Sequence, residues 1–227
     1  MSIRDYITER ALKSTKVFNF ADTEVEQIDD FDEDIDCEKI FKDVENAVPR
    51  KFLQGIKKVK IENRPDFEER NLTALYHDGV LYLAPKLGSD GSIVTDIIHE
   101  LAHHIETLYT GFIYDDGSLQ REFLKKRHEL EFELRSEGYW TGDYDFEDIN
   151  YNEKLDKFLY KRVGPNMLRL ITTGMFIRPY AAISIREYFA TGFEAYYLGK
   201  RDKLDKISPV LYDKIKELHT YDQEDLI

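Results

Sequence analysis

The sequence predicts a helix-rich α+β domain, and three observations carry that prediction. A hairpin pattern of short apolar strands lies in the first half of the chain. Amphipathic helical patterns follow it almost to the end of the sequence. No internal repeat or low-complexity linker interrupts them, and 227 residues with 42% hydrophobic side chains are enough to bury one core.

The strands are expected directly ahead of the longest helical pattern. Residues 56–61 alternate apolar and basic side chains, which predicts a short strand. Residues 72–76 and 80–83 are typical of a hairpin, because the sequence His-Asp-Gly between them favours a tight turn. We therefore expect a small sheet or hairpin before the helical part of the chain.

The clearest helix is expected at residues 92–109, with a stop at Thr110 and Gly111. Its apolar residues recur at helical spacing and are Ile93, Ile97, Ile98, Leu101, Ile105 and Leu108. Further helices are predicted at residues 119–136, 153–162, 165–173, 184–197 and 208–219, with Ser184 as an N-cap. Residues 137–152, rich in Gly, Tyr, Trp and Asp, are expected to form a loop.

The N-terminal part differs in composition. Residues 22–38 contain ten acidic side chains and no basic one, so we expect a solvated surface loop or a short helix there. On this basis residues 1–50 are predicted to be an acidic lead-in, and residues 51–227 the folded domain.

Four aspartates in this segment alternate as in a calcium loop: Asp30, Asp32, Asp34 and Asp36. An EF-hand loop would need glycine where Ile35 stands and glutamate where Phe41 stands. A solvated acidic face is therefore preferred, and a calcium-responsive acidic adaptor is kept as an alternative.

Charge and cysteine content limit the partners and the compartment. Lys and Arg number 32 against 45 Asp and Glu, a net charge of −13, which argues against binding to nucleic acid or to anionic membranes. The single cysteine, Cys37, rules out an internal disulfide and permits a reducing compartment. Residues 1–20 lack a signal-peptide core, so a cytoplasmic or virion-associated location is expected. The oligomeric state is left open.

The predicted helix at residues 92–109 contains the motif H-E-x-x-H, with His99, Glu100 and His103. Residues four apart lie one turn above one another, so both imidazoles can face one metal ion while Glu100 lies beside them. Two neutral nitrogen ligands, a third protein ligand and one open position are the arrangement of catalytic zinc sites. Glu100 could then transfer the protons.

The motif is specific. With six His and 22 Glu in the chain, chance predicts about 0.02 occurrences. The alternative is an amphipathic helix that tolerates histidines at its edge. Because Ile97, Ile98, Leu101 and Ala102 flank the motif, the histidines lie near buried surface, where imidazoles need partners. We therefore favour a metal site.

A third histidine ligand is not expected. The elongated motif would need glycine and histidine where Glu106 and Tyr109 stand. His104 adjoins His103 and must face away from the same metal. The other histidines, His77, His128 and His219, are isolated in the sequence. A glutamate from a later helix is the natural third ligand.

Glu187 is the preferred glutamate, because it begins an otherwise apolar and aromatic helix. The alternative is a capping box with Ser184, at the S-x-x-E spacing. Gly192 favours the ligand role, since it would let this helix approach the His99 helix closely. Glu122 and Glu129 are less favoured, because their neighbours form a charged, solvated face.

The pairing of H-E-L-A-H-H at residues 99–104 with E-Y-F-A at residues 187–190, and with Tyr180 seven residues before Glu187, indicates a family. It resembles the catalytic domain of the anthrax lethal factor-like zinc endopeptidases, a branch of the gluzincins. The resemblance covers about residues 72–215. It implies a helix-rich zincin fold.

Position by position, the resemblance implies that His99, His103 and Glu187 hold Zn²⁺ and that Glu100 is the general base. Tyr180 would lend its hydroxyl to the oxyanion of the tetrahedral intermediate. For Tyr180 the alternative is one of fifteen tyrosines packing its ring in the core.

The chain departs from the family pattern in two places. Glu187 lies 88 residues after His99, so residues 113–162 are predicted to be an insertion that covers or shapes the cleft. Thr191 stands where some relatives carry an acid, and Glu194 is the candidate to replace it in supporting the metal ligands.

The predicted function is therefore that of a zinc-dependent metallo-endopeptidase that cleaves a protein or peptide substrate by metal-activated water. An extended peptide could pair with an edge strand of the predicted hairpin. The alternative from a different class is a non-catalytic binding or virion-structural protein with a zincin fold and a structural zinc.

Overall fold

The computed structural model describes residues 16–31, 35–65, 67, 72–85 and 90–221. The chain divides into two compact units, Met1–His104 and Ile105–Ile227. This division differs from the predicted boundary at residue 50. It falls inside one helix, α4 (Asp90–Tyr114).

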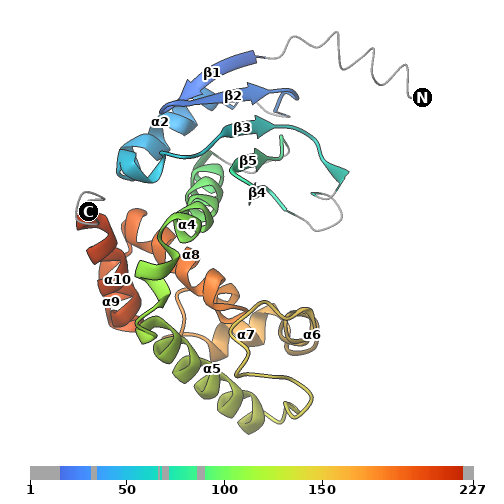
Figure 1. Cartoon of the computed structure of the whole chain (residues 1–227). Helices are drawn as coiled ribbons and strands as arrows, with labels where there is room; N and C mark the ends of the chain where they lie inside the picture. Colours follow the sequence, from blue (N-terminus) through green and yellow to red (C-terminus); the bar gives the residue numbers. More distant parts are fainter. Residues whose placement is uncertain (1–15, 32–34, 66, 68–71, 86–89, 222–227) are drawn as a thin grey trace, which may run out of the picture. The chain divides into compact units, whose positions relative to one another are not determined.

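The first unit is built on a mixed sheet, drawn in blue to green in Figure 1. Its strands are β1 (Lys16–Phe20), β2 (Thr23–Gln27), β3 (Lys58–Ile61), β4 (Ala74–His77) and β5 (Val80–Leu83). Within the described residues their order is β1-β2-β3-β5-β4. β2, β3 and β5 are parallel, whereas β1 and β4 pair antiparallel with their neighbours. The sheet therefore ends in β1 on one side and β4 on the other.

The predicted hairpin is confirmed as β4 and β5. Its two-residue turn places Asp78 at φ 52° and Gly79 at φ 87°, the left-handed conformation that a type I′ turn requires at both positions. A Cβ on Gly79 would also lie 2.8 Å from the Lys57 side chain. The turn pairs His77 with Val80 and thereby sets the register of the hairpin.

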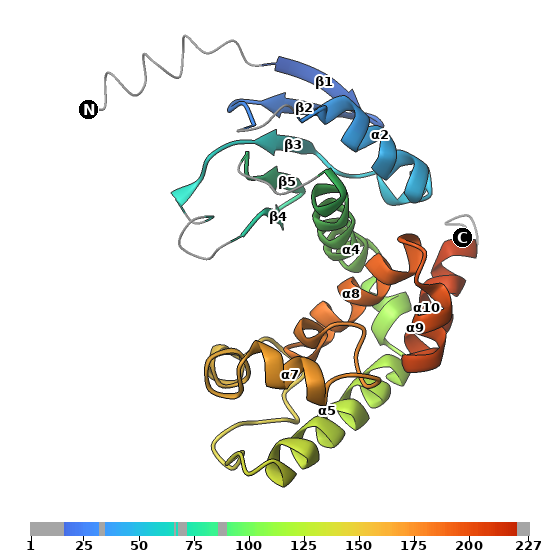
Figure 2. The same ribbon diagram turned by 180° about the vertical axis from the view of Figure 1, so that it is seen from behind.

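Helix α2 (Cys37–Ala47) covers one face of the sheet near β1 (Figure 2). Its N-cap is Asp36, whose carboxylate accepts from the amide of Lys39 at 3.0 Å. The ring of Phe41 packs on Phe18 and Phe20 of β1, at centroid distances of 5.6 and 4.8 Å. A short 3₁₀ helix, η1 (Arg50–Phe52), follows.

The acidic segment is more structured than the sequence predicted. Instead of a loop or short helix, its first part is strand β2, which alternates exposed acids with the buried side chains of Thr23, Val25 and Gln27. Residues 16–52 therefore contribute strands and core to the first unit rather than a lead-in. Of the supposed calcium ligands, Asp32 and Asp34 lie outside the described residues, and Asp36 caps α2.

Helix α4 forms as the apolar spacing predicted, with Ile93, Ile97, Ile98, Leu101 and Ile105 buried, whereas Leu108 of the same series is 46% exposed. The predicted stop at Thr110 and Gly111 is a kink instead. Tyr109 leaves helical geometry at φ −121° and ψ 27°, and the helix then resumes to Tyr114. Residues 90–108 are one uninterrupted helix.

The second unit is helical, drawn in light green to red in Figures 1 and 2. After the end of α4 it contains α5 (Ser118–Ser136), α6 (Glu153–Lys157), the π-helix η2 (Phe158–Val163), α7 (Pro165–Ile171), the 3₁₀ helix η3 (Pro179–Ala182), α8 (Ile185–Tyr197), α9 (Arg201–Ile207) and α10 (Pro209–Thr220). The α+β class is thus confirmed. In the described part of the chain, no helix combines the length and the apolar character that crossing a membrane requires.

Helix α8 is the centre of the second unit and packs on α5, α9, α10 and η3. Almost all of its side chains are buried. Gly192 allows α10 to approach, because a Cβ there would lie 2.3 Å from the Leu211 side chain. We expected Gly192 to serve a close approach to the His99 helix, and within this unit it serves the packing of α8 on α10. The predicted insertion, residues 113–162, spans the end of α4, α5, the following loop, α6 and most of η2 in the same unit.

Candidate metal centre

His99 and His103 lie one turn apart on α4, in the first unit. Both side chains are half-buried, and their rings meet edge to face with centroids 5.2 Å apart. The buried residues Ile98, Leu101 and Ala102 fix the opposite face of the helix in the core. The motif therefore presents two imidazoles on one helical face, as its spacing predicted.

Glu100 is attached to the edge of the sheet. Its Oε2 accepts a hydrogen bond from the backbone amide of Tyr76, in β4, at 2.7 Å. The amide of Ala84 donates to the carbonyl of Thr73, and the β4–β5 register therefore leaves the backbone groups of Tyr76 on the outer side of β4. The Glu100 carboxylate consequently lies at the side of β4 where a further strand would pair.

His104 faces the interior and is not available as a ligand. Its Nε2 donates to the carbonyl of Gln54 at 2.8 Å, and its Nδ1 accepts from the hydroxyl of Tyr76 at 2.7 Å. Burial lowers the pKa of His104 and so favours the neutral imidazole, in which Nδ1 is an acceptor when Nε2 donates. Tyr76 thus holds α4 twice, through Glu100 and through His104.

Glu187 lies in the first turn of α8, in the second unit. Ser184 is the N-cap, as predicted, and its Oγ accepts from the Glu187 amide at 3.2 Å. Thr191 donates its hydroxyl to the carbonyl of Glu187 at 2.8 Å. The Glu187 side chain is half-buried.

The neighbour of Glu187 is tied to helix α4 by an ion pair that the sequence did not reveal. Arg186 Nε donates to Glu106 Oε2 at 3.1 Å, and Glu106 also accepts from the hydroxyl of Tyr114. Burial, aided by the Glu106 carboxylate, raises the pKa of Tyr114, so its hydroxyl stays a donor. The sequence did contain a signal for Glu106. It lies seven residues after His99 and three after His103, which places it on the same face of the helix.

Tyr180 lies in η3, just ahead of α8, and 49% of its surface is exposed. Arg178, two residues earlier, forms an ion pair with Glu194 of α8. Glu194 is only 2% exposed. Glu194, the residue proposed to support the metal ligands, is thus buried and pairs with the segment that carries Tyr180.

The rejected glutamates differ from one another. Glu129 is exposed, as expected. Glu122 is not on a solvated face: its carboxylate accepts from the hydroxyl of Tyr188 at 2.7 Å and from the amides of Val210 and Leu211 at 2.9 and 3.1 Å. It therefore caps α10 and has a structural task.

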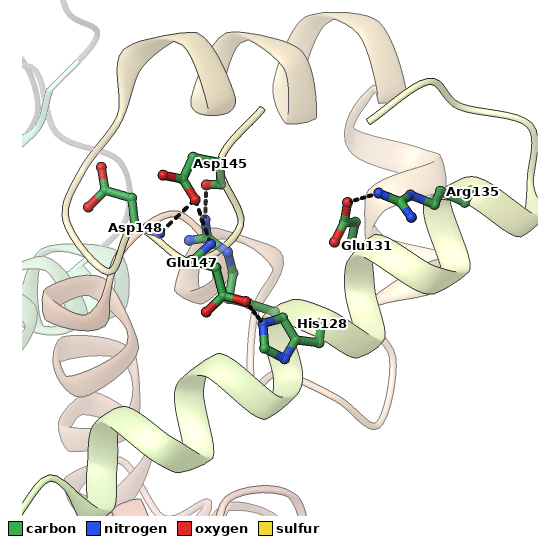
Figure 3. Close-up of polar contacts among 7 residues, drawn as sticks. His128, Glu131, Arg135, Asp145, Glu147 and Asp148 are labelled. Atoms are coloured by element: carbon green, nitrogen blue, oxygen red, sulfur yellow. Dashed lines mark hydrogen bonds and ion pairs between the residues drawn. The ribbon is translucent and has the colours of Figure 1, made fainter. Parts of the chain in front are cut away.

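The other histidines have partners of their own. His77 is exposed beside Asp78, His128 pairs with Glu147 (Figure 3), and His219 bonds the hydroxyl of Tyr197 at 2.9 Å. Cys37 is buried with its thiol 3.8 Å from Gln27 Oε1, and it is the only cysteine of the chain. Imidazole nitrogens and carboxylate oxygens are therefore the donors that a metal could find near the motif.

No protein-family model, curated protein or solved structure matches the chain. The family resemblance therefore stays a prediction based on the motif residues themselves.

Proposed function

We propose that the protein is a zinc-dependent metallo-endopeptidase with a gluzincin-like fold. The observation that carries the proposal lies wholly within the first unit. An H-E-x-x-H motif forms part of one helix, and its glutamate is hydrogen-bonded to the outer edge of a sheet. This combines a metal-binding pair, a proton acceptor and a peptide-pairing edge at one place.

Zinc is proposed to be held by His99 and His103 of α4 and by Glu187 of α8, the ligand set that the family resemblance implies. Two neutral imidazoles and one carboxylate suit zinc and leave the ion a net positive charge. Support for Glu187 comes from the adjacent ion pair, since Arg186 bonds Glu106 on the stripe of α4 that also bears the histidines. Zinc bound there would supply Lewis acidity and lower the pKa of water.

Glu100 is assigned the proton transfers. Its carboxylate accepts the proton of the attacking water and later passes it to the leaving amine. The hydrogen bond from the Tyr76 amide orients the carboxylate. The hydroxyl of Tyr180 is proposed to donate a hydrogen bond to the developing oxyanion. One such directed donor lowers the barrier by about 3 kcal/mol.

The substrate is proposed to be an extended protein or peptide segment. Within the described residues β4 is an edge strand. The backbone groups of Ala74 and the carbonyl of Tyr76 point away from β5, while the outward amide of Tyr76 already donates to Glu100. A peptide that pairs with such an edge gains backbone hydrogen bonds with little demand on its sequence. Its scissile bond would then pass the Glu100 carboxylate.

The test is metal analysis together with hydrolysis of a peptide library. We expect about one zinc per chain, cleavage that a chelator abolishes, and cleavage that added zinc restores. Glu100→Gln should retain zinc and lose hydrolysis, because the amide cannot take up the proton. Undiminished cleavage by zinc-loaded Glu100→Gln would refute the role of Glu100. Zinc binding without any hydrolysis would favour a non-catalytic zincin-fold protein.

A further inference from the structure

The connection between α7 and α8, which carries Tyr180, is anchored at both ends by cations of α5. Lys126 donates to the carbonyl of Met175 at 2.9 Å, and Arg127 donates to the carbonyl of Ala182 at 2.9 Å. Both side chains are buried, Arg127 completely. Hydrogen bonds from buried charged groups are the stronger kind, so the two ends are fixed to one helix.

The anchor at Ala182 is itself supported from the other side. Arg127 also donates to the carbonyl of Asp145, at 3.1 Å, in the loop after α5. The Asp145 carboxylate accepts from the amides of Glu147 and Asp148 at 2.8 and 3.2 Å, and His128 bonds Glu147 (Figure 3). This loop is therefore ordered where it holds Arg127.

Between the two anchors, Arg178 is held by Glu194. The guanidinium donates to a carboxylate that is 2% exposed. A buried carboxylate without a cation is costly, so this pair stays formed in the folded protein. The backbone of the 3₁₀ turn connects Arg178 with Tyr180. The amide of Ala181 donates to the carbonyl of Arg178 at 3.1 Å, and the amide of Ile183 donates to the carbonyl of Tyr180 at 3.2 Å.

We propose that Arg178, paired with Glu194, is a positioning residue that holds the Tyr180 hydroxyl in place for the reaction. The inference rests on the proposed function, in which that hydroxyl stabilises the oxyanion. Tyr180 is 49% exposed, so its neighbours cover only part of the ring, and the backbone bond from Ala181 to the carbonyl of Arg178 links the ion pair to the turn that carries Tyr180. Misplacement of a reacting group by about 1 Å can cost about 100-fold in rate.

The first experiment needs no activity and no metal. Hydrogen exchange is measured on the metal-free full chain as Arg178→Met and as Arg178→Met/Glu194→Gln, which removes both charges and leaves no buried ion unpaired. The amides of residues 181–183 should exchange at least about tenfold faster than in the parent protein, while those of α5 keep their rates. Unchanged exchange at residues 181–183 in the double variant would overturn the proposal.

The second experiment is a double-mutant cycle on hydrolysis, with Arg178→Met, Tyr180→Phe and their combination. Arg178→Met should lower kcat by about 10-fold or more with KM and zinc content within about twofold of the parent. In the Tyr180→Phe background the same change should cost less than about twofold, since no hydroxyl remains to be positioned. If the fold-loss in kcat of the double variant equals the product of the two single losses, Arg178 acts independently of Tyr180 and the inference is refuted.

Arg178→Lys separates positioning from stability. Lysine keeps the charge that Glu194 needs and should recover most of the kcat lost in Arg178→Met, although lysine lacks the planar fork of arginine. No recovery, in a variant whose urea midpoint equals that of the parent, would contradict a positioning role. If the parent protein hydrolyses no peptide, the proposed function fails, whereas the exchange experiment still decides whether Arg178 orders the Tyr180 segment.

Discussion

At the scale of single residues, adjacent histidines have opposite surroundings. His103 is half-buried on the face that it shares with His99, while His104 is buried and bonds both Gln54 and Tyr76. Helical geometry turns successive side chains by about 100°, so two neighbours cannot face the same metal. The sequence predicted this division because it depends only on local helix geometry.

Replacing the proposed third ligand should weaken zinc binding. In Glu187→Gln the amide oxygen is a poorer donor than the carboxylate, and zinc affinity should fall more than the roughly 10–100-fold typical of changes around a metal site's ligands. The measurement is competition with a chromophoric chelator. Glu129→Gln is the matched control, since Glu129 is exposed on α5, whereas Glu122 caps α10 and is unsuitable. Equal affinities in the two variants would show that Glu187 is not a ligand.

Tyr180→Phe should separate catalysis from metal binding. Loss of one oxyanion donor typically lowers kcat by about 10²–10³-fold. Zinc content should not change, because the hydroxyl is not among the proposed ligands. Steady-state kinetics with metal analysis of the same sample provides the check, and an unchanged kcat would reduce Tyr180 to a packing residue.

The thiol of Cys37 should be nearly unreactive in the folded protein. Burial raises its pKa from 9.0 to about 11, so at pH 8 the thiolate should be about 100-fold scarcer than for an unperturbed thiol. Iodoacetamide labelling, followed by mass spectrometry, should be slow at pH 8 and should accelerate up to about pH 11. The urea-unfolded chain is the control, and equal rates in the folded and unfolded states would contradict the assignment.

At the scale of elements, the close contact of α8 with α10 makes Gly192 a sensitive position. Gly192→Ala puts a Cβ against Leu211 and should destabilise the protein by about 1–3 kcal/mol, the usual cost of overpacking. Adding Leu211→Ala should recover part of the loss. Urea unfolding measures both effects.

Gly111→Ala is the control for this substitution. Its nearest neighbour would be the end of the Asp115 side chain at 3.1 Å, which can move, and alanine favours helix by up to about 1 kcal/mol. It should be neutral or stabilising. If Gly192→Ala is equally well tolerated, the packing interpretation of Gly192 is wrong.

Elements with local signals were predicted, and elements that depend on distant partners were not. The β4–β5 hairpin has its turn sequence, and α4 and α5 have long apolar periodicities. β2 was missed because its acids dominate the composition, although they occupy only the positions of the strand that are not buried. Its partner β3 lies more than 30 residues away, so the burial of Val25 depends on a pairing that no local pattern reveals.

At the scale of the whole molecule, the proposed zinc ligands belong to both units, the histidines to Met1–His104 and the glutamate to Ile105–Ile227. Metal binding should therefore stabilise the full chain. At zinc concentrations of about 100 times Kd, ligand linkage gives about 2.7 kcal/mol. Urea unfolding with zinc and with chelator measures this difference, and Glu187→Gln should reduce it. An unfolding midpoint that does not respond to zinc would argue against a bound metal.

The sequence by itself determined the α+β class, the main helices and the spacing that brings His99, Glu100 and His103 onto one helix, because each follows from interactions within a few residues. The tertiary structure alone decided that Glu100 meets the outer edge of β4, that Glu106 anchors Arg186 and that Glu194 holds Arg178. These contacts join residues 16 to 80 positions apart. Burial and charge pairing across such distances depend on how the elements pack, which local patterns do not specify.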